Sequence, residues 1–102
     1  MNPPRLLDNA AEHRFELHED GAVAGFAEYR IDDGAVRFTH TEVDRAREGQ
    51  GLGSELAAFA LDEARRRGLR VVPACGFIAA FMQRHPHYQD LLDEGSRRDF
   101  KA

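Results

Sequence analysis

The feature that most constrains this chain is a change of hydrophobic period near its middle. Before residue 43, apolar and polar residues alternate, which is the two-residue period of a strand with one buried face. After residue 53, apolar residues recur at the spacing of an amphipathic helix. A chain of 102 residues supports one hydrophobic core. Both halves are therefore expected to share that core.

Two turn signals divide the first half into three strands. Asp20-Gly21 and Asp33-Gly34 each contain the Asp-Gly dipeptide that indicates a tight hairpin. We predict the strands within residues 13–43. Because a tight turn joins antiparallel neighbours, the sequence predicts an antiparallel meander.

The pattern of the second half predicts a helix, a strand and another helix. The predicted elements are a helix near 53–67, a parallel strand near 69–73, a helix near 76–84 and one further turn within 88–92. A strand, helix and strand at this length indicate a right-handed crossover to a parallel neighbour. The predicted fold class is α/β in the mixed α+β sense, with the meander followed by that crossover.

Composition and charge limit the extent of the domain, its possible partners and its expected compartment. We predict one domain over 13–94, a flexible N-terminal segment over 1–12 and a polar tail over 95–102. The net charge of −4 argues against a nucleic-acid partner, which needs a basic face. The single cysteine and the short apolar runs favour a cytoplasmic protein outside the membrane. A monomer is the default expectation.

Three glycines at alternate positions form the loop between the meander and the first helix. Gly49, Gly51 and Gly53 permit positive φ and a close approach to the backbone. The helix that follows offers unpaired amides and the positive end of its dipole, which suits a pyrophosphate. A plain flexible connector explains the same spacing equally well. The loop lacks the Gly-Lys-Ser/Thr of a Walker loop and the spacing of a Rossmann fingerprint.

A longer pattern resembles a known family. Its members carry Gln/Arg-x-x-Gly-x-Gly/Ala between a strand and a helix, and the matching stretch here is 48–53, with Glu48 in place of Gln or Arg. The resemblance extends to 67–75 and 84–88, and covers about Asn9 to Leu92. The chain resembles the GCN5-related N-acetyltransferase superfamily. Within it, the pattern is similar to the short branch that includes the human N-acetyltransferase domain-containing protein 1 and small plant and bacterial proteins.

The resemblance implies a minimal acyl-CoA N-acyltransferase fold. Acetyl-CoA would lie where two parallel strands separate, one ending near Val43 and the other near Val72. Backbone amides from Gln50 to Ser54 would hold the pyrophosphate. The implied cofactor-binding residues are Val43, Glu48, Gly49, Gln50, Gly51, Leu52, Gly53, Ser54, Pro73, Cys75 and Arg84.

Two titratable residues near the end of the third strand are candidate bases. By strict alternation, His40 and Glu42 share a face with Val36 and Phe38. Either side chain would then remove a proton from an attacking amine, directly or through water. An ordinary half-buried histidine and a solvated glutamate explain these two residues equally well.

Cys75 is the third catalytic candidate, because it follows the last predicted strand. It would accept the acetyl group as a covalent nucleophile and pass it on. A small buried apolar residue is the ordinary alternative. The tyrosine that many larger relatives use as an acid corresponds here to Phe81, which carries no proton to give.

The function expected from these residues is acetyl transfer from acetyl-CoA to an amine, either a small molecule or a protein lysine. An acyl-CoA-binding module with little turnover is the main alternative, and a plain interaction domain is the third. No metal is expected, because His85-Pro86-His87 has no further ligand nearby in the sequence. Cofactor binding separates the third reading from the others, and release of free thiol separates the first two.

Overall fold

The computed structural model describes residues 4–47 and 49–99. Its strands are β1 (Arg5–Asn9), β2 (Arg14–Glu19), β3 (Ala22–Asp32), β4 (Ala35–Val43) and β5 (Arg70–Pro73). Its α-helices are α1 (Leu52–Arg66), α2 (Gly76–Arg84) and α3 (Glu94–Asp99), and its 3-10 helices are η1 (Ala10–Glu12), η2 (Arg45–Arg47) and η3 (Pro86–Leu91).

The strands form one mixed sheet in the order β1-β2-β3-β4-β5. All neighbours are antiparallel except β4 and β5, which are parallel. Both hairpins turn at the predicted Asp-Gly dipeptides, where Gly21 has φ 79° and Gly34 has φ 75°. Positive φ at these positions matches the twist of the flanking strands, which is why the dipeptides identify the turns. The predicted meander and crossover are confirmed.

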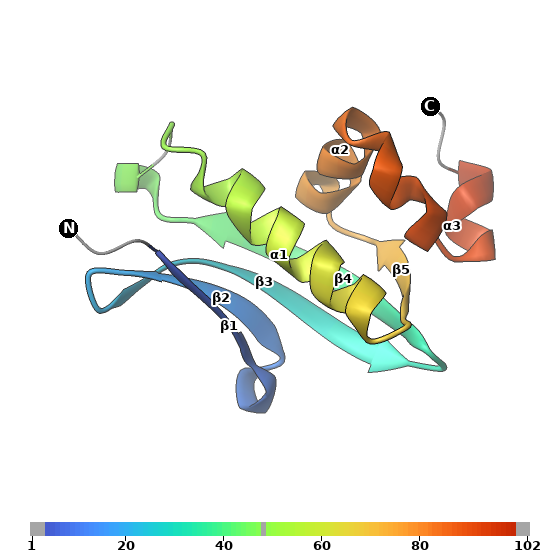
Figure 1. The fold of residues 1–102 in the computed structure, drawn as a ribbon, viewed down its shortest axis with the longest axis horizontal. Coiled ribbons are helices and arrows are strands. Elements are labelled where there is room, and N and C mark those ends of the chain that lie inside the picture. The colour runs from blue at the N-terminus through green and yellow to red at the C-terminus, as the bar shows by residue number, and fades with distance from the viewer. Residues whose placement is uncertain (1–3, 48, 100–102) are drawn as a thin grey trace.

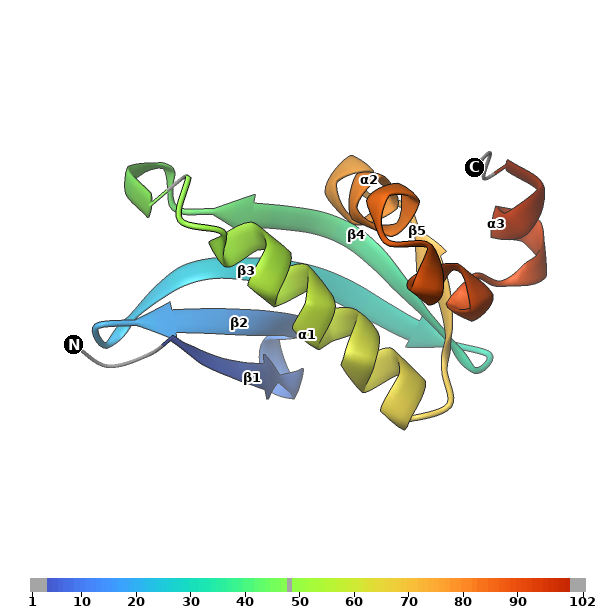
Figure 2. The same cartoon turned by 45° about the horizontal axis from the view of Figure 1, so that its top comes forward.

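The two longer helices lie on the same face of the sheet. In Figures 1 and 2, α1 crosses β2, β3 and β4, and α2 lies beside it near β4 and β5. The short α3 packs next to β5 at the edge of the sheet. This arrangement brings the start of α1 and the start of α2 to the same end of β4.

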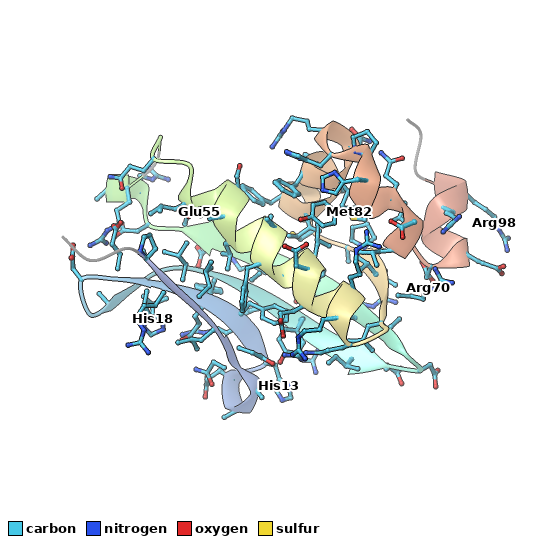
Figure 3. The ribbon with its side chains drawn as sticks, viewed as in Figure 1. His13, His18, Glu55, Arg70, Met82 and Arg98 are labelled. Atoms are coloured by element: carbon cyan, nitrogen blue, oxygen red, sulfur yellow. The ribbon has the colours of Figure 1, made fainter. Side chains whose placement is uncertain are left out.

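The core lies between this helix layer and the sheet. Figure 3 shows Met82 of α2 in the region between α1 and α2, and its side chain is fully buried. The largest fully buried side chains come from both layers and are Phe38, Leu17, Leu56, Leu61, Ile78, Met82, Val36 and Val71. The apolar faces of the strands and helices therefore meet in one core, as the two hydrophobic periods require.

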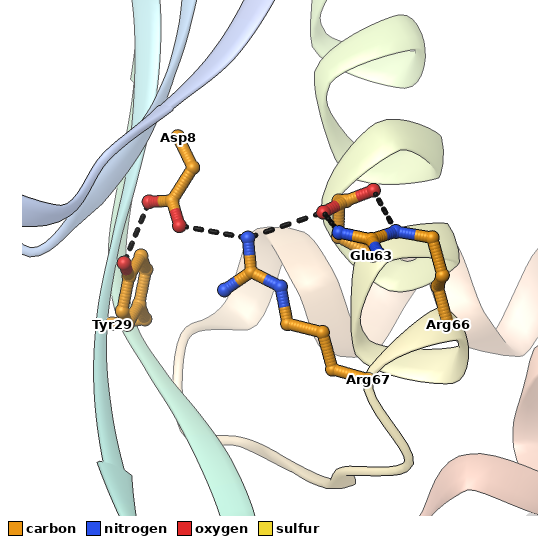
Figure 4. Close-up of polar contacts among 5 residues, drawn as sticks. All are labelled: Asp8, Tyr29, Glu63, Arg66 and Arg67. Carbon is orange, nitrogen blue, oxygen red and sulfur yellow. Dashed lines mark hydrogen bonds and ion pairs between the residues drawn. The ribbon is translucent and has the colours of Figure 1, made fainter.

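The described part of the N-terminal segment, from residue 4 onwards, differs from the prediction of a flexible 1–12, whose residues 1–3 lie outside the described residues. Residues 5–9 form β1, which pairs antiparallel with β2, and Leu6 packs against the core. Asp8 accepts a 2.6 Å hydrogen bond from the Tyr29 hydroxyl and a 2.8 Å bond from Arg67, which also pairs with Glu63 (Figure 4). These partners are distant in sequence, so the local pattern of a polar, proline-containing segment does not reveal them.

The C-terminal segment also differs over the part that the structure describes. The predicted polar tail begins at residue 95, but Glu94–Asp99 form α3. The Asp93 carboxylate accepts a hydrogen bond from the Ser96 amide at 2.9 Å, and the Asp93 amide donates to the Val71 carbonyl at 3.1 Å. A capping aspartate and a contact to β5 thus hold a short polar helix that lacks an apolar face of its own.

A buried carboxylate lies on β2. Glu16 is 3% exposed and accepts hydrogen bonds from Arg14 at 2.6 Å and Asn9 at 3.0 Å. It also lies 2.8 Å from the ring of His18, which Figure 3 labels on the same strand. Burial alone raises the pKa of Glu16, but the hydrogen bonds from His18, Arg14 and Asn9 outweigh it and lower the pKa to about 2. The folded state therefore favours the ionised carboxylate.

Replacing Glu16 with Gln should change how stability depends on acid. A lowered folded-state pKa contributes stability above the unfolded value, and that stability is lost as pH falls from 4.5 towards about 2. The size of the shift corresponds to about 3 kcal/mol. We expect the free energy of unfolding in urea to fall more over this range in the native chain than in Glu16→Gln. The exposed Glu12→Gln is the control, and equal acid dependence in the native chain and Glu16→Gln would contradict the assignment.

Candidate functional site

The parallel strands β4 and β5 pair over only part of their length. Their ladder runs from Ala35↔Arg70 to Phe38↔Pro73, whereas β4 continues to Val43. After β5 the chain turns into α2, so residues 39–43 of β4 run beside the start of that helix. The two ends that the resemblance implies for the site, the glycine loop and Cys75, both lie at this end of β4.

The glycine loop has the geometry of an anion-binding site. Gly49 has φ 89° and Gly51 has φ 77°, and the space beside each α-carbon is open. Gly51 is the N-cap of α1, and no side chain of the described residues caps that helix. The amides of its first turn are therefore available to a phosphate, next to the positive end of the helix dipole. This arrangement fits the pyrophosphate of coenzyme A.

Gly53 has a different role from the other two glycines. It is helical, and a Cβ built there would lie 2.6 Å from the ring of Phe77. The side-chain position of this glycine is therefore closed by the close approach of α1 and α2. Leu52 is buried in the core, while Gln50 and Ser54 are exposed. Glu48 lies outside the described residues.

A β-bulge in β4 overturns the predicted placement of His40 and Glu42. His40 lies opposite Glu28 while Phe38 lies opposite Tyr29, so Thr39 is an extra residue on β4. An extra residue reverses the alternation of side chains beyond it. His40 and Glu42 therefore point to the face opposite Phe38.

On that outer face the two candidate bases are close to each other. His40 Nε2 lies 3.6 Å from Glu42 Oε2, and their side chains are 53% and 61% exposed. The ring of His40 also lies 6.0 Å from that of Phe26. Glu42 lines a shallow groove of about 600 Å³ on this side, together with Phe26 and Arg45. The two residues are brought together as predicted, but away from the helices.

Thr41 takes the inward position next to Cys75. Its hydroxyl oxygen lies 3.2 Å from the sulfur of Cys75, a buried residue that is 8% exposed. Cys75 is the N-cap of α2, and its sulfur accepts a 3.4 Å hydrogen bond from the Ile78 amide. Sequence reasoning missed Thr41, because the bulge that turns it inward leaves no signal in the hydrophobic pattern.

The remaining predicted residues take varied positions. Val43 packs against the core beside Gly53, and Pro73 is the last β5 residue paired with β4. Arg84 is exposed in the last turn of α2, at the opposite end of that helix from Cys75. Phe81 is buried and stacks on His85 with ring centroids 4.0 Å apart.

A metal-binding cluster and a membrane-spanning helix are both absent from residues 4–47 and 49–99. No group of three or more His, Cys, Asp or Glu side chains in these residues is arranged to hold a metal ion. No helix in the same residues is long and apolar enough to cross a bilayer.

Comparison with solved structures shows where this fold occurs. A GCN5-like protein from Staphylococcus aureus, assigned as an N-acetyltransferase, has a TM-score of 0.71 at 23% identity, with 91% of each chain covered. The ribosomal-protein-S18-alanine N-acetyltransferase of Escherichia coli has a TM-score of 0.59 at 26% identity, covering 81% of this chain and 53% of its own. A Desulfovibrio desulfuricans protein assigned to the GNAT family has a TM-score of 0.53 at 22% identity, covering 72% of this chain and 52% of its own.

Sequence comparison defines the family. The chain spans about half the length of the last two structures, but nearly the whole of the first. The search of curated proteins gave no match. The family model of GCN5-related N-acetyltransferases matches residues 14–91, which include every strand from β2 to β5 as well as α1 and α2. The chain therefore belongs to the GCN5-related N-acetyltransferase family.

Proposed function

We propose that this protein is an acetyl-CoA-dependent N-acetyltransferase that transfers the acetyl group to an amine. The observation that carries the proposal is the arrangement around the end of β4. An uncapped helix start with two positive-φ glycines lies on one side, and the Cys75–Thr41 pair lies on the other. A phosphate cradle and a nucleophile flanking the same strand suit a donor that has phosphates at one end and a thioester at the other.

Acetyl-CoA is the donor substrate, and it supplies an acetyl group activated as a thioester. The first-turn amides of α1, from Gly51 to Ser54, would bind its pyrophosphate. The end of β4 near Val43, together with Pro73, would line the path towards Cys75. Arg84 remains a proposed contact for the 3′-phosphate, which does not have to lie close to Cys75.

Cys75 would act as the nucleophile. Its thiolate forms a sulfur–carbon bond to the acetyl carbonyl carbon, and the thioester bond breaks with its electron pair leaving on the coenzyme A sulfur. A neutral amine then attacks the acetyl-cysteine, which forms the amide and returns the electron pair to the Cys75 sulfur. The proton that the amine loses goes to solvent. Each step conserves atoms and charge without a further reactant.

Direct attack of the amine on the donor is the alternative route. His40 or Glu42 would then accept the amine proton. Because both side chains point to the outer face, this route requires the acceptor to enter from that side. The groove beside Glu42 and Phe26 offers such an approach.

A binding module with little turnover is the second candidate function. Phe81 favours it, because the position that carries a tyrosine acid in many larger relatives is here a buried ring without a proton to donate. In that case, coenzyme A binds at the glycine loop but an amine does not accelerate thiol release. We also infer that the chain belongs to the short branch of the family, since the Staphylococcus aureus structure matches it over nearly its full length.

The test is a titration with coenzyme A followed by a turnover assay with acetyl-CoA. We expect binding with a Kd between roughly micromolar and millimolar, equivalent to about −8 to −4 kcal/mol. A small polyamine, an amino sugar and a lysine peptide serve as acceptors. Release of more than one equivalent of free thiol with any of them supports the enzyme. Binding without release supports the module, and a lack of binding excludes both.

A further inference from the structure

We propose that Thr41 is the positioning residue for Cys75, donating its hydroxyl hydrogen to the sulfur and favouring the thiolate. This inference rests on the proposed function, because it assigns a partner to the nucleophile proposed there. Thr41 touches neither donor nor acceptor in this assignment, and its own O–H bond stays intact throughout the transfer.

The first support is that two hydrogen-bond partners from different elements lie at the sulfur. The Ile78 amide donates to it from the first turn of α2 at 3.4 Å, and the Thr41 oxygen lies 3.2 Å away on β4. A thiolate accepts hydrogen bonds but gives none. With the Thr41 hydroxyl as donor, two hydrogens from two different elements point at the same buried sulfur. Both bonds strengthen when the sulfur is charged.

The second support is the bulge that brings Thr41 to this place. If Thr39 were a regular ladder residue and β4 had no bulge, strict alternation from Phe38 would turn His40 towards the helices and Thr41 away from them. Bulges next to functional sites commonly re-aim a side chain. In this chain the bulge places the Thr41 hydroxyl next to the sulfur and turns the His40 imidazole to the other face. The bulge thus makes the contact between Thr41 and Cys75 possible.

The charged side chains on the elements around Cys75 face away from it or lie towards the other end of their element. Thr41 is therefore the side chain expected to affect the pKa of the thiol most. From β4, His40 and Glu42 flank Thr41 but point to the opposite face. On α2, the first charged side chain after Cys75 is Arg84, in the last turn. Arg70 lies at the far end of β5, and Glu55 is exposed on α1.

The experiment compares Thr41→Val with Thr41→Ser by the pH dependence of Cys75 alkylation, followed by intact mass. Valine keeps the shape of threonine but removes the hydroxyl, and serine keeps the hydroxyl. The chain has a single cysteine, so every added alkyl group reports on this site. We expect the midpoint of the profile to rise by about one pH unit in Thr41→Val, a tenfold lower thiolate fraction at lower pH. Thr41→Ser should restore the native midpoint.

Thiolate absorbance provides a second reading of the same midpoint. The chain has no tryptophan and two tyrosines, Tyr29 and Tyr88. Burial, together with hydrogen bonds to Asp8 and Asp62, raises the pKa of both tyrosines to about 12, so tyrosinate absorbance appears only at much higher pH. A thiolate signal can therefore be followed without interference at pH values below those at which tyrosinate forms.

Two outcomes overturn the proposal: an unchanged midpoint in a folded Thr41→Val, or a Thr41→Ser profile equal to that of valine. Circular dichroism checks the fold of each variant. If Thr41→Val does not fold, Thr41→Ser and Thr41→Ala still isolate the hydroxyl. All profiles are recorded without coenzyme A. Failure of this proposal is therefore distinct from failure of acetyl transfer, which the turnover assay measures separately.

Discussion

Gly51→Asp should strongly weaken coenzyme A binding and leave the fold intact. Gly51 has φ 77°, with open space beside its α-carbon, and it caps the first turn of α1. Aspartate is among the side chains that best tolerate this left-handed region, so the backbone should keep its shape. The new carboxylate would then lie among the amides that we assign to the pyrophosphate. Repulsion and occupied space should weaken binding by roughly a hundredfold or more, about 2.7 kcal/mol.

Gly51→Asn is the matched control for this prediction. Asparagine has the same size and the same tolerance of positive φ, but no charge. Calorimetric titration of the three proteins should therefore rank affinity as native, then Asn, then Asp. A folded Gly51→Asp that binds as tightly as the native chain would show that the phosphates bind elsewhere.

Cys75→Ser should retain coenzyme A binding but lose acetyl transfer. Serine is a good N-cap, so it keeps the hydrogen bond from the Ile78 amide that the cysteine sulfur accepts at 3.4 Å. A serine hydroxyl without an activating base is a poor nucleophile at neutral pH. We expect the transfer rate to fall by roughly three orders of magnitude or more, as happens when a covalent nucleophile is removed. The native chain should gain one acetyl group on Cys75 after incubation with acetyl-CoA.

Cys75→Ala adds a second test, because it removes the cap as well as the nucleophile. It should lose about 1 kcal/mol of stability relative to Cys75→Ser and be equally inactive. Near-normal transfer by either variant would rule out the covalent route. The direct route would then be favoured, and His40→Ala and Glu42→Gln would be the variants to measure by the same thiol-release assay.

The sequence predicted this fold well where short-range patterns specify structure. The tight turns at Asp20-Gly21 and Asp33-Gly34 require positive φ, which few other residue types adopt without strain. The hairpins could therefore be located without coordinates. The helical spacing after Gly53 and the glycine at position 68 likewise fixed α1 and its end. The sequence analysis missed β1, which pairs with β2 and whose Asp8 accepts hydrogen bonds from Tyr29 and Arg67, far along the chain.

The same distinction between local pattern and long-range contact applies to the candidate site. The sequence by itself determined the backbone shape of the glycine loop, because positive-φ glycines before a helix start are a local property. It also determined that a cysteine follows the last strand. Only the tertiary structure decided which β4 side chain meets that cysteine, since one extra residue in a ladder reverses the facing of all that follow. Strand pairing places that residue at Thr39, so Thr41 reaches the sulfur while His40 and Glu42 face the opposite side of the sheet.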